Sequence, residues 1–338
     1  MLLSLKVENF LSFRDEVTLE LLPSSIKELE ENVAVSPYNT TRVLKSAVVY
    51  GANSSGKSNL LNALIFIKKF VMNSARNTQV DEIIGVESFL LSSRTEARPS
   101  RFEINFVIDN LKYRFGFKID SHVVHEEWLY YTKVNKEYLC YTRNYSDFNI
   151  EPKFEEALNL QNRTRANALF LSVIAQFNGK TASRIVQWFN AVKYISDTNK
   201  PTLQNYTAKL LEQEKYEILI KRFLSYINLG FNNVRVEKIN IEALEIFREF
   251  LRENKNANTI KTEHIKYDEN GMAVGKVFFN LNKNESLGSQ KLFAISGLVI
   301  ESLATGNVLV VDELDARLHP SLTLGIIRLF NSIENNPK

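Results

Sequence analysis

The sequence predicts an α/β fold with a mostly parallel core sheet, an antiparallel β subdomain and a helical insertion. The pattern G-x-x-x-x-G-K-S at residues 51–58 lies between an apolar, strand-like run at 47–50 and a helix-like stretch at 59–73. A second, uninterrupted apolar run at 308–311 is typical of a central parallel strand that is buried on both faces. Residues 102–119 alternate between apolar and polar side chains, which indicates antiparallel strands.

Residues 1–150 form the predicted N-terminal lobe. Apolar residues alternate with polar ones at 3–7 and again at 17–21, which predicts two half-exposed strands joined by a loop. The run 43–50 predicts the buried strand that leads into the 51–58 loop. The helix after that loop is apolar on most sides, so we expect it to pack inside the domain.

The alternating block continues as further antiparallel strands. The dipeptide Asp109-Asn110 separates its first two runs, which is a strong hairpin signal. Residues 123–132 and 137–142 predict two more strands. Cys140, the single cysteine, lies in an apolar run and is predicted to be a core residue rather than a nucleophile.

After the β block the pattern becomes helical, which predicts a largely helical insertion at 151–258. Residues 206–228 predict one long helix whose charges form a solvated face. The C-terminal lobe, 259–338, is expected to open with two strands around the turn at 269–271. A helix that Gly306 ends should follow.

Composition narrows the class of protein. The 338 residues are 44% apolar and 24% charged, as in soluble globular proteins, and a net charge of +3 does not by itself indicate nucleic-acid binding. A single cysteine excludes an internal disulfide framework and suits a reducing cytosol. No run approaches the ~20 apolar residues of a membrane span, so we expect a cytoplasmic protein without membrane contact.

The 51–58 pattern is a phosphate loop. Its glycines let backbone N–H groups converge on a polyphosphate, and the helix start adds the positive end of a dipole. Lys57 supplies a charge for the β- and γ-phosphates, and the Ser58 hydroxyl supplies a ligand for Mg²⁺. The expected ATP-contacting residues of this loop are Asn53, Ser54, Ser55, Gly56, Lys57, Ser58 and Asn59.

Two carboxylates end the second apolar run. Because ligands of parallel sheets bind beyond the carboxyl ends of the strands, Asp312 and Glu313 are expected beside the phosphate loop if the two strands are neighbours. Asp312 would hold Mg²⁺ together with Ser58, and Glu313 would orient or deprotonate the attacking water. The long separation of the two motifs along the chain is typical of ABC-type ATPases rather than of small kinases or GTPases.

Four segments together resemble the RecF/SMC/OLD branch of ABC-type ATPases, and most closely the OLD-type ATP-binding proteins of bacterial anti-phage and abortive-infection systems. They are Asn9 to Phe13, the phosphate loop, Glu285 to Lys291, and Asp312 to Pro320. The resemblance implies an ABC-type P-loop ATPase head. It also implies a head-to-head dimer or higher oligomer, in which Ser286 and Gly288 of one subunit contact the γ-phosphate held by the other. Residues 286–289 also fit a helix N-cap turn, and the two roles are compatible. The resemblance also implies that Asn9, Phe13 and Arg14 lie where this branch often supports the nucleotide base; the alternative is a loop that joins two strands, with Phe10 and Phe13 in the core.

The sequence also departs from that pattern. The signature reads Ser286-Leu287-Gly288-Ser289 rather than Ser-Gly-Gly-Gln, and Gln79 matches the Mg²⁺-linked glutamine by position only. His319, before Pro320 at a helix start, is expected to cap that helix or to fix a loop. The final strand and the switch histidine of the family are expected beyond Lys338.

Three functions are compatible with these features. The first is an ATPase of anti-phage defence, whose nucleotide-driven dimer senses a trigger or scaffolds a separately encoded nuclease or toxin. The second is a RecF/SMC-like repair ATPase that binds DNA through a basic surface, although the chain lacks long coiled-coil heptads. That surface would comprise Lys112, Arg114, Arg163 and Arg165. The third is an assembly module that binds ATP with little turnover.

Overall fold

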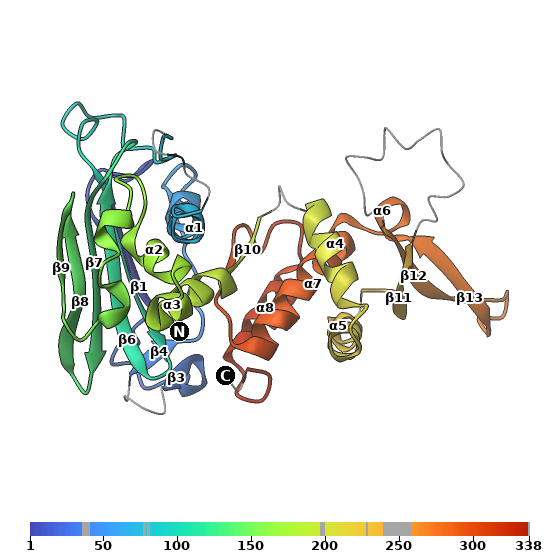
Figure 1. Cartoon of the computed structure of the whole chain (residues 1–338). Coiled ribbons are helices and arrows are strands. Elements are labelled where there is room, and N and C mark those ends of the chain that lie inside the picture. The colour runs from blue at the N-terminus through green and yellow to red at the C-terminus, as the bar shows by residue number, and fades with distance from the viewer. Residues whose placement is uncertain are drawn as a thin grey trace. The chain divides into compact units, whose positions relative to one another are not determined.

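A computed structural model divides the chain into two compact units, Met1–Val192 (unit 1) and Lys193–Lys338 (unit 2) (Figure 1). The residues it describes are 1–35, 41–76, 79, 82–196, 200–227, 229–238 and 258–336. The predicted lobe boundary after residue 150 falls inside unit 1, and the predicted boundary at 258 falls at the first residue of a strand in unit 2. The division into three parts therefore stays a prediction.

Unit 1 is built on a seven-stranded antiparallel sheet of order β2-β1-β5-β6-β7-β8-β9. Its strands are β1 (Leu2–Glu8), β2 (Val17–Glu20), β5 (Ser100–Ile108), β6 (Leu111–Ile119), β7 (Val124–Lys133), β8 (Lys136–Asn144) and β9 (Asp147–Ile150). The predicted N-terminal strand pair and the meander are confirmed. Asp109 and Asn110 have φ values of 44° and 73°, as a type I′ hairpin turn requires.

Helices α1 (Lys57–Asn73), α2 (Phe170–Gln176) and α3 (Lys180–Ala191) lie along one face of this sheet (Figure 1). Aromatic rings form the contact: Phe66 of α1 stacks on Phe102 at 5.1 Å, and Trp188 of α3 stacks on Phe106 at 4.4 Å. The apolar side chains of alternate β5 residues thus bury themselves under the helices. Short 3₁₀ turns at Glu30–Asn32, Glu155–Ala157 and Gln161–Arg163, and the small pair β3 (Val33–Val35) and β4 (Arg42–Leu44), complete the unit.

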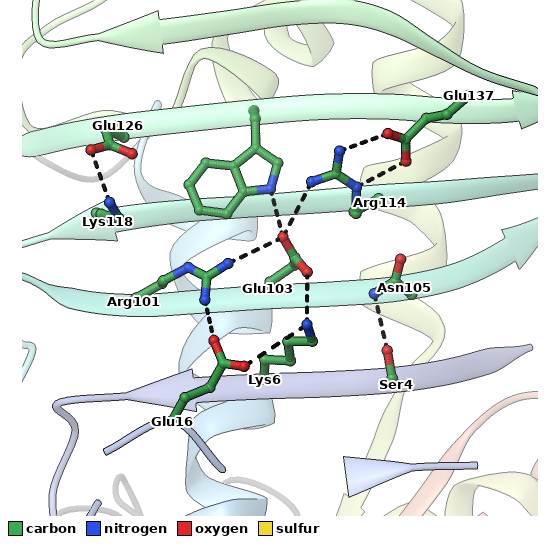
Figure 2. Close-up of polar contacts among 11 residues, drawn as sticks. Ser4, Lys6, Glu16, Arg101, Glu103, Asn105, Arg114, Lys118, Glu126 and Glu137 are labelled. Carbon is green, nitrogen blue, oxygen red and sulfur yellow. Dashed lines mark hydrogen bonds and ion pairs between the residues drawn. The ribbon is translucent and has the colours of Figure 1, made fainter. Parts of the chain in front are cut away.

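On the opposite face of the sheet, polar side chains of neighbouring strands form ion pairs and hydrogen bonds with one another (Figure 2). The carboxylate of Glu103 accepts a hydrogen bond from the Trp128 indole at 3.1 Å and from Arg114 at 3.4 Å, and it also pairs with Arg101 at 3.6 Å and Lys6 at 3.8 Å. The indole of Trp128 lies over Gly116, where a Cβ would meet the ring at 2.4 Å. Only glycine therefore leaves room for the ring at this position.

A buried carboxylate joins the sheet to α2. Glu127 has no exposed surface, and its two oxygens accept hydrogen bonds from the backbone N–H groups of Phe170 and Leu171 and from the hydroxyl of Tyr141. The guanidinium of Arg143 lies 3.7 Å from the same carboxylate. Burial raises the pKa of Glu127, while the charge of Arg143 and the backbone donors act in the opposite direction.

Unit 2 is organised around one buried helix, α7 (Leu287–Thr305), on which the unit's apolar core is centred. Around it lie α4 (Lys200–Leu210), α5 (Glu214–Ile227), α6 (Leu281–Asn284) and α8 (Pro320–Asn331), and Gly306 ends α7 at φ 71° as predicted. Strands β10 (Lys193–Ile195) and β14 (Leu309–Val311) form a parallel pair, and β11 (Asn233–Lys238), β12 (Asn258–Tyr267) and β13 (Ala273–Asn280) form an antiparallel sheet.

The mixed α/β class is confirmed, but four predictions differ from the structure: the mostly parallel sheet, the strand at 43–50, the burial of the 308–311 strand on both faces, and the single helix at 206–228. Parallel pairing in the described part of the chain is limited to β10 and β14, and the predicted strand at 43–50 is strand only as far as Leu44, with Tyr50 88% exposed. An apolar run does not by itself provide the neighbouring strand that would pair with its backbone. For the same reason β14, in a sheet of two, is half-buried rather than covered on both faces.

The helix predicted at 206–228 is instead two helices, because α4 and α5 each pack against α7 with a turn at 211–213 between them.

Two further predictions concern the surface and the core. In the described residues, no helix is long and apolar enough to cross a membrane. Cys140 is buried as predicted, and burial raises the pKa of its thiol to about 12.

We expect the Cys140 thiol of the folded protein to resist alkylation, since the thiolate is the reactive form and it is both inaccessible and disfavoured. At pH 8, iodoacetamide followed by mass spectrometry should give little labelling of native protein and full labelling in denaturant. Rapid labelling of the native protein would contradict this placement.

Replacing Glu127 by alanine should destabilise unit 1 by about 3–5 kcal/mol, because it removes the counter-charge of the buried Arg143 guanidinium and leaves two helix N–H groups without their acceptor. Glu126→Ala is the matched control. Its carboxylate is half-exposed and pairs with Lys118, so its loss should cost at most about 1 kcal/mol. Denaturant titration of both variants measures the difference, and equal midpoints would contradict the assignment.

Candidate functional site

The phosphate loop lies on the surface of unit 1 and leads directly into α1. Gly56 is the N-cap of α1 at φ 93°, and Ser54 also has a positive φ of 62°. No side chain caps the first turn of α1, whereas Ser286 caps α7 and His319 caps α8. The start of α1 is thus shaped for an external anion, which fits the phosphates of a nucleotide.

Lys57 folds back over this loop. Its ammonium donates to the carbonyl oxygens of Gly51 at 2.8 Å and Ala52 at 2.7 Å. The positive charge is therefore held against the loop backbone, at the place where the sequence predicts the phosphates to bind.

A second loop, residues 10–13, supports the phosphate loop from within unit 1. Phe10 and Phe13 exchange backbone hydrogen bonds of 3.0 and 2.9 Å, and the hydroxyl of Ser12 accepts from the amide of Asn59 at 2.9 Å. The ring of Phe13 lies so close to Gly56 that a Cβ there would meet it at 3.1 Å. The role of Ser12 was not predicted, because it depends on a contact between segments 47 residues apart.

The other two residues of the base-support prediction have structural partners. Asn9 is 2% exposed, and its amide donates to the carbonyls of Thr95 and Arg98 and accepts from Phe89 N–H. It therefore anchors the 89–98 loop. Arg14 is exposed and pairs with Asp15.

The acidic motif lies at the end of β14 in unit 2. The N–H of Asp312 donates to the carbonyl of Ile195 at 2.9 Å, which extends the parallel ladder by one residue. Glu313 follows with φ 52°, so the chain turns sharply there and the Glu313 side chain is exposed. The turn ends the strand and leaves both carboxylates beyond its carboxyl end, as predicted.

Lys291 connects the turn at Asp312 and Glu313, the acidic turn, to the turn at Ser286 to Ser289, the signature turn. It is 5% exposed, lies in α7, and its ammonium donates to the carbonyls of Glu313 at 2.6 Å and Ala316 at 2.9 Å. Gly288 packs against the same loop, where a Cβ would meet the carbonyl oxygen of Arg317 at 2.9 Å. These contacts join residues 286–291 and 313–317 into one structural element.

Ser286 has the capping role that its position allows. Its hydroxyl accepts from the N–H of Ser289 at 3.1 Å and lies 3.0 Å from the Ser289 hydroxyl. His319 likewise accepts from the N–H of Ser321 and caps α8, one of the two roles predicted for it.

The predicted site residues thus occupy two units. Unit 1 carries residues 53–59, and unit 2 carries Ser286, Gly288, Asp312 and Glu313. Gln79, in unit 1, is exposed; its N–H donates to Glu82 and its carbonyl accepts from Asn167. Lys291 was not singled out from the sequence; its position directly after the signature turn is the one signal that the sequence offered for it.

Comparison with known proteins identifies the family. A family model described as "AAA domain, putative AbiEii toxin, Type IV TA system" matches residues 46–338. No curated protein matches the chain. Among solved structures, the SMC head domain from Thermotoga maritima is similar at 13% identity and a TM-score of 0.39, over 99% of this chain and 85% of that chain. Because the family model spans most of the sequence, including both nucleotide motifs, the protein belongs to this AAA-domain family of P-loop ATPases.

Proposed function

We propose that the protein binds ATP with Mg²⁺ at the phosphate loop and hydrolyses it in a site completed by a second subunit. The observation that carries this proposal is that the chain has two features together. The start of α1 has no side-chain cap, and Lys291 fixes the acidic turn to the signature turn. A nucleotide held by one subunit would bridge to residues 286–288 of its partner.

Each residue has a definite task in this proposal. Lys57 exchanges the carbonyls of Gly51 and Ala52 for phosphate oxygens, and the first N–H groups of α1 bind the same anion. Ser58 and Asp312 hold the Mg²⁺, which neutralises phosphate charge when bound. Glu313 takes the proton of the attacking water.

We further propose a cytosolic role in anti-phage defence, in which the ATP-bound dimer senses a trigger or scaffolds a separately encoded effector. The description of the family supports this role, since it names a toxin of a toxin–antitoxin system. DNA binding through the predicted basic surface has less support. Arg114 pairs with Glu103 and Glu137, and Arg165 donates to the carbonyl of Ala75.

Lys57→Ala should weaken binding of MgATP by about tenfold to a hundredfold, because it removes a charged hydrogen-bond donor to phosphate. Glu313→Gln should leave binding intact and lower kcat by about a hundredfold or more. Lys69→Ala, on an exposed position of the same helix, and Glu334→Gln, on the surface of unit 2, are the matched controls. Calorimetry and phosphate release separate the two effects.

Unchanged binding in Lys57→Ala would contradict the nucleotide site. Unchanged turnover in Glu313→Gln would remove Glu313 from the chemistry, and tight binding without turnover in the wild type would favour the assembly module.

The composite site can be tested by mixing two inactive variants. Ser286→Asp keeps the N-cap of α7 and opposes a γ-phosphate with negative charge, and Ser286→Asn keeps the cap without charge. In a mixture of Ser286→Asp and Lys57→Ala, mixed dimers combine one intact phosphate loop with one intact signature turn. Random pairing should restore about a quarter of wild-type turnover.

Each variant alone should be inactive, and Ser286→Asn should retain activity. Mass photometry of Glu313→Gln with MgATP should show the dimer directly. A mixture as inactive as its components, with dimers present, would mean that the site is formed within one chain.

A further inference from the structure

Glu285, the residue before the signature turn, is held by side chains of strand β12. One oxygen of the Glu285 carboxylate, Oε1, accepts from the Thr262 hydroxyl at 2.5 Å and lies 2.7 Å from Nε2 of His264. Thr262 and His264 are alternate residues of β12 and so share one face of that strand. Glu285 itself is only 9% exposed at its side chain.

The ring of His264 is fixed by its neighbours. It packs against Phe279 of β13 with ring centroids 4.7 Å apart and against Phe231 at 6.3 Å. A carboxylate oxygen only accepts, so Nε2 must carry the proton and donate it. The three-stranded sheet of unit 2 therefore presents two aligned donors to one oxygen.

The backbone on the other side of Glu285 is held as well. The carbonyl of Glu285 accepts from the Gln290 amide at 2.9 Å, and the oxygen of that amide accepts from Lys200 at 2.6 Å. Ser286 comes next in the chain and caps α7. The side chain and the carbonyl of Glu285 are thus both held, and these contacts constrain the backbone that leads into Ser286.

We infer that Glu285 is a positioning residue, which His264 and Thr262 use to set the orientation of Ser286 toward the nucleotide of the partner subunit. This inference rests on the proposed function. It adds that the sheet of β11, β12 and β13 controls the rate of hydrolysis without touching the nucleotide. A contact made only when two subunits close on ATP affects kcat rather than the binding of ATP to the phosphate loop.

His264→Leu, which removes the donor at nearly constant volume, should lower kcat for ATP about tenfold or more and leave KM and the melting temperature close to wild type. His264→Gln keeps an N–H donor on a side chain of similar reach and should restore most of the turnover. His122→Leu, an exposed histidine of unit 1, is the control and should match the wild type.

A double variant tests the coupling. Adding Glu285→Gln to His264→Leu should lower kcat no further than the stronger single change, because the two residues act through one contact.

The outcomes separate this inference from the proposed function. A wild type that does not turn over MgATP would overturn both, since the positioning acts only through turnover. An active wild type whose kcat is unchanged in His264→Leu would overturn the positioning role alone. If His264→Leu changes kcat, KM and the melting temperature together, or if His264→Gln does not restore turnover, the contact is merely structural.

Discussion

The hydrogen bonds of the buried Lys291 ammonium are the constraint on which unit 2 depends. A charge removed from water is costly unless its donors are satisfied, and the carbonyls of Glu313 and Ala316 satisfy two of them. The acidic turn therefore cannot change its backbone path without leaving a buried cation partly unpaired. This cost fixes Glu313 relative to the start of α7 and makes two motifs that are distant in sequence behave as one element.

The starts of the helices also depend on whether their N–H donors have acceptors. At the starts of α7 and α8, the side chains of Ser286 and His319 each accept one N–H group of the first turn. α1 begins at Gly56 without such a cap, on an exposed loop, with a lysine close by. Of these three helix starts, that of α1 has no side chain as a cap, and the loop before it carries the G-x-x-x-x-G-K-S pattern.

Local patterns predicted local structure well. The alternation at 102–119 and the Asp109-Asn110 turn specify a hairpin because both the side-chain period and the positive φ values are encoded nearby. Contacts between distant segments were not predictable in this way. The lack of strand structure at 47–50, the break between α4 and α5, and the roles of Ser12 and Lys291 depend on neighbours that only the folded chain provides. The local sequence likewise predicted that Ser286 caps a helix, but not that Glu285, next to it, is bound to β12.

The Trp128 indole on Gly116 constrains how this sheet can vary during evolution. The ring fills the space above β6 and donates to Glu103, which in turn gathers the cations of three neighbouring positions. A side chain at 116 would displace the ring, and loss of the ring would expose the glycine backbone and remove a partner of Glu103. Positions 103, 116 and 128 should therefore change together among relatives, as a covarying set rather than as three independently conserved sites.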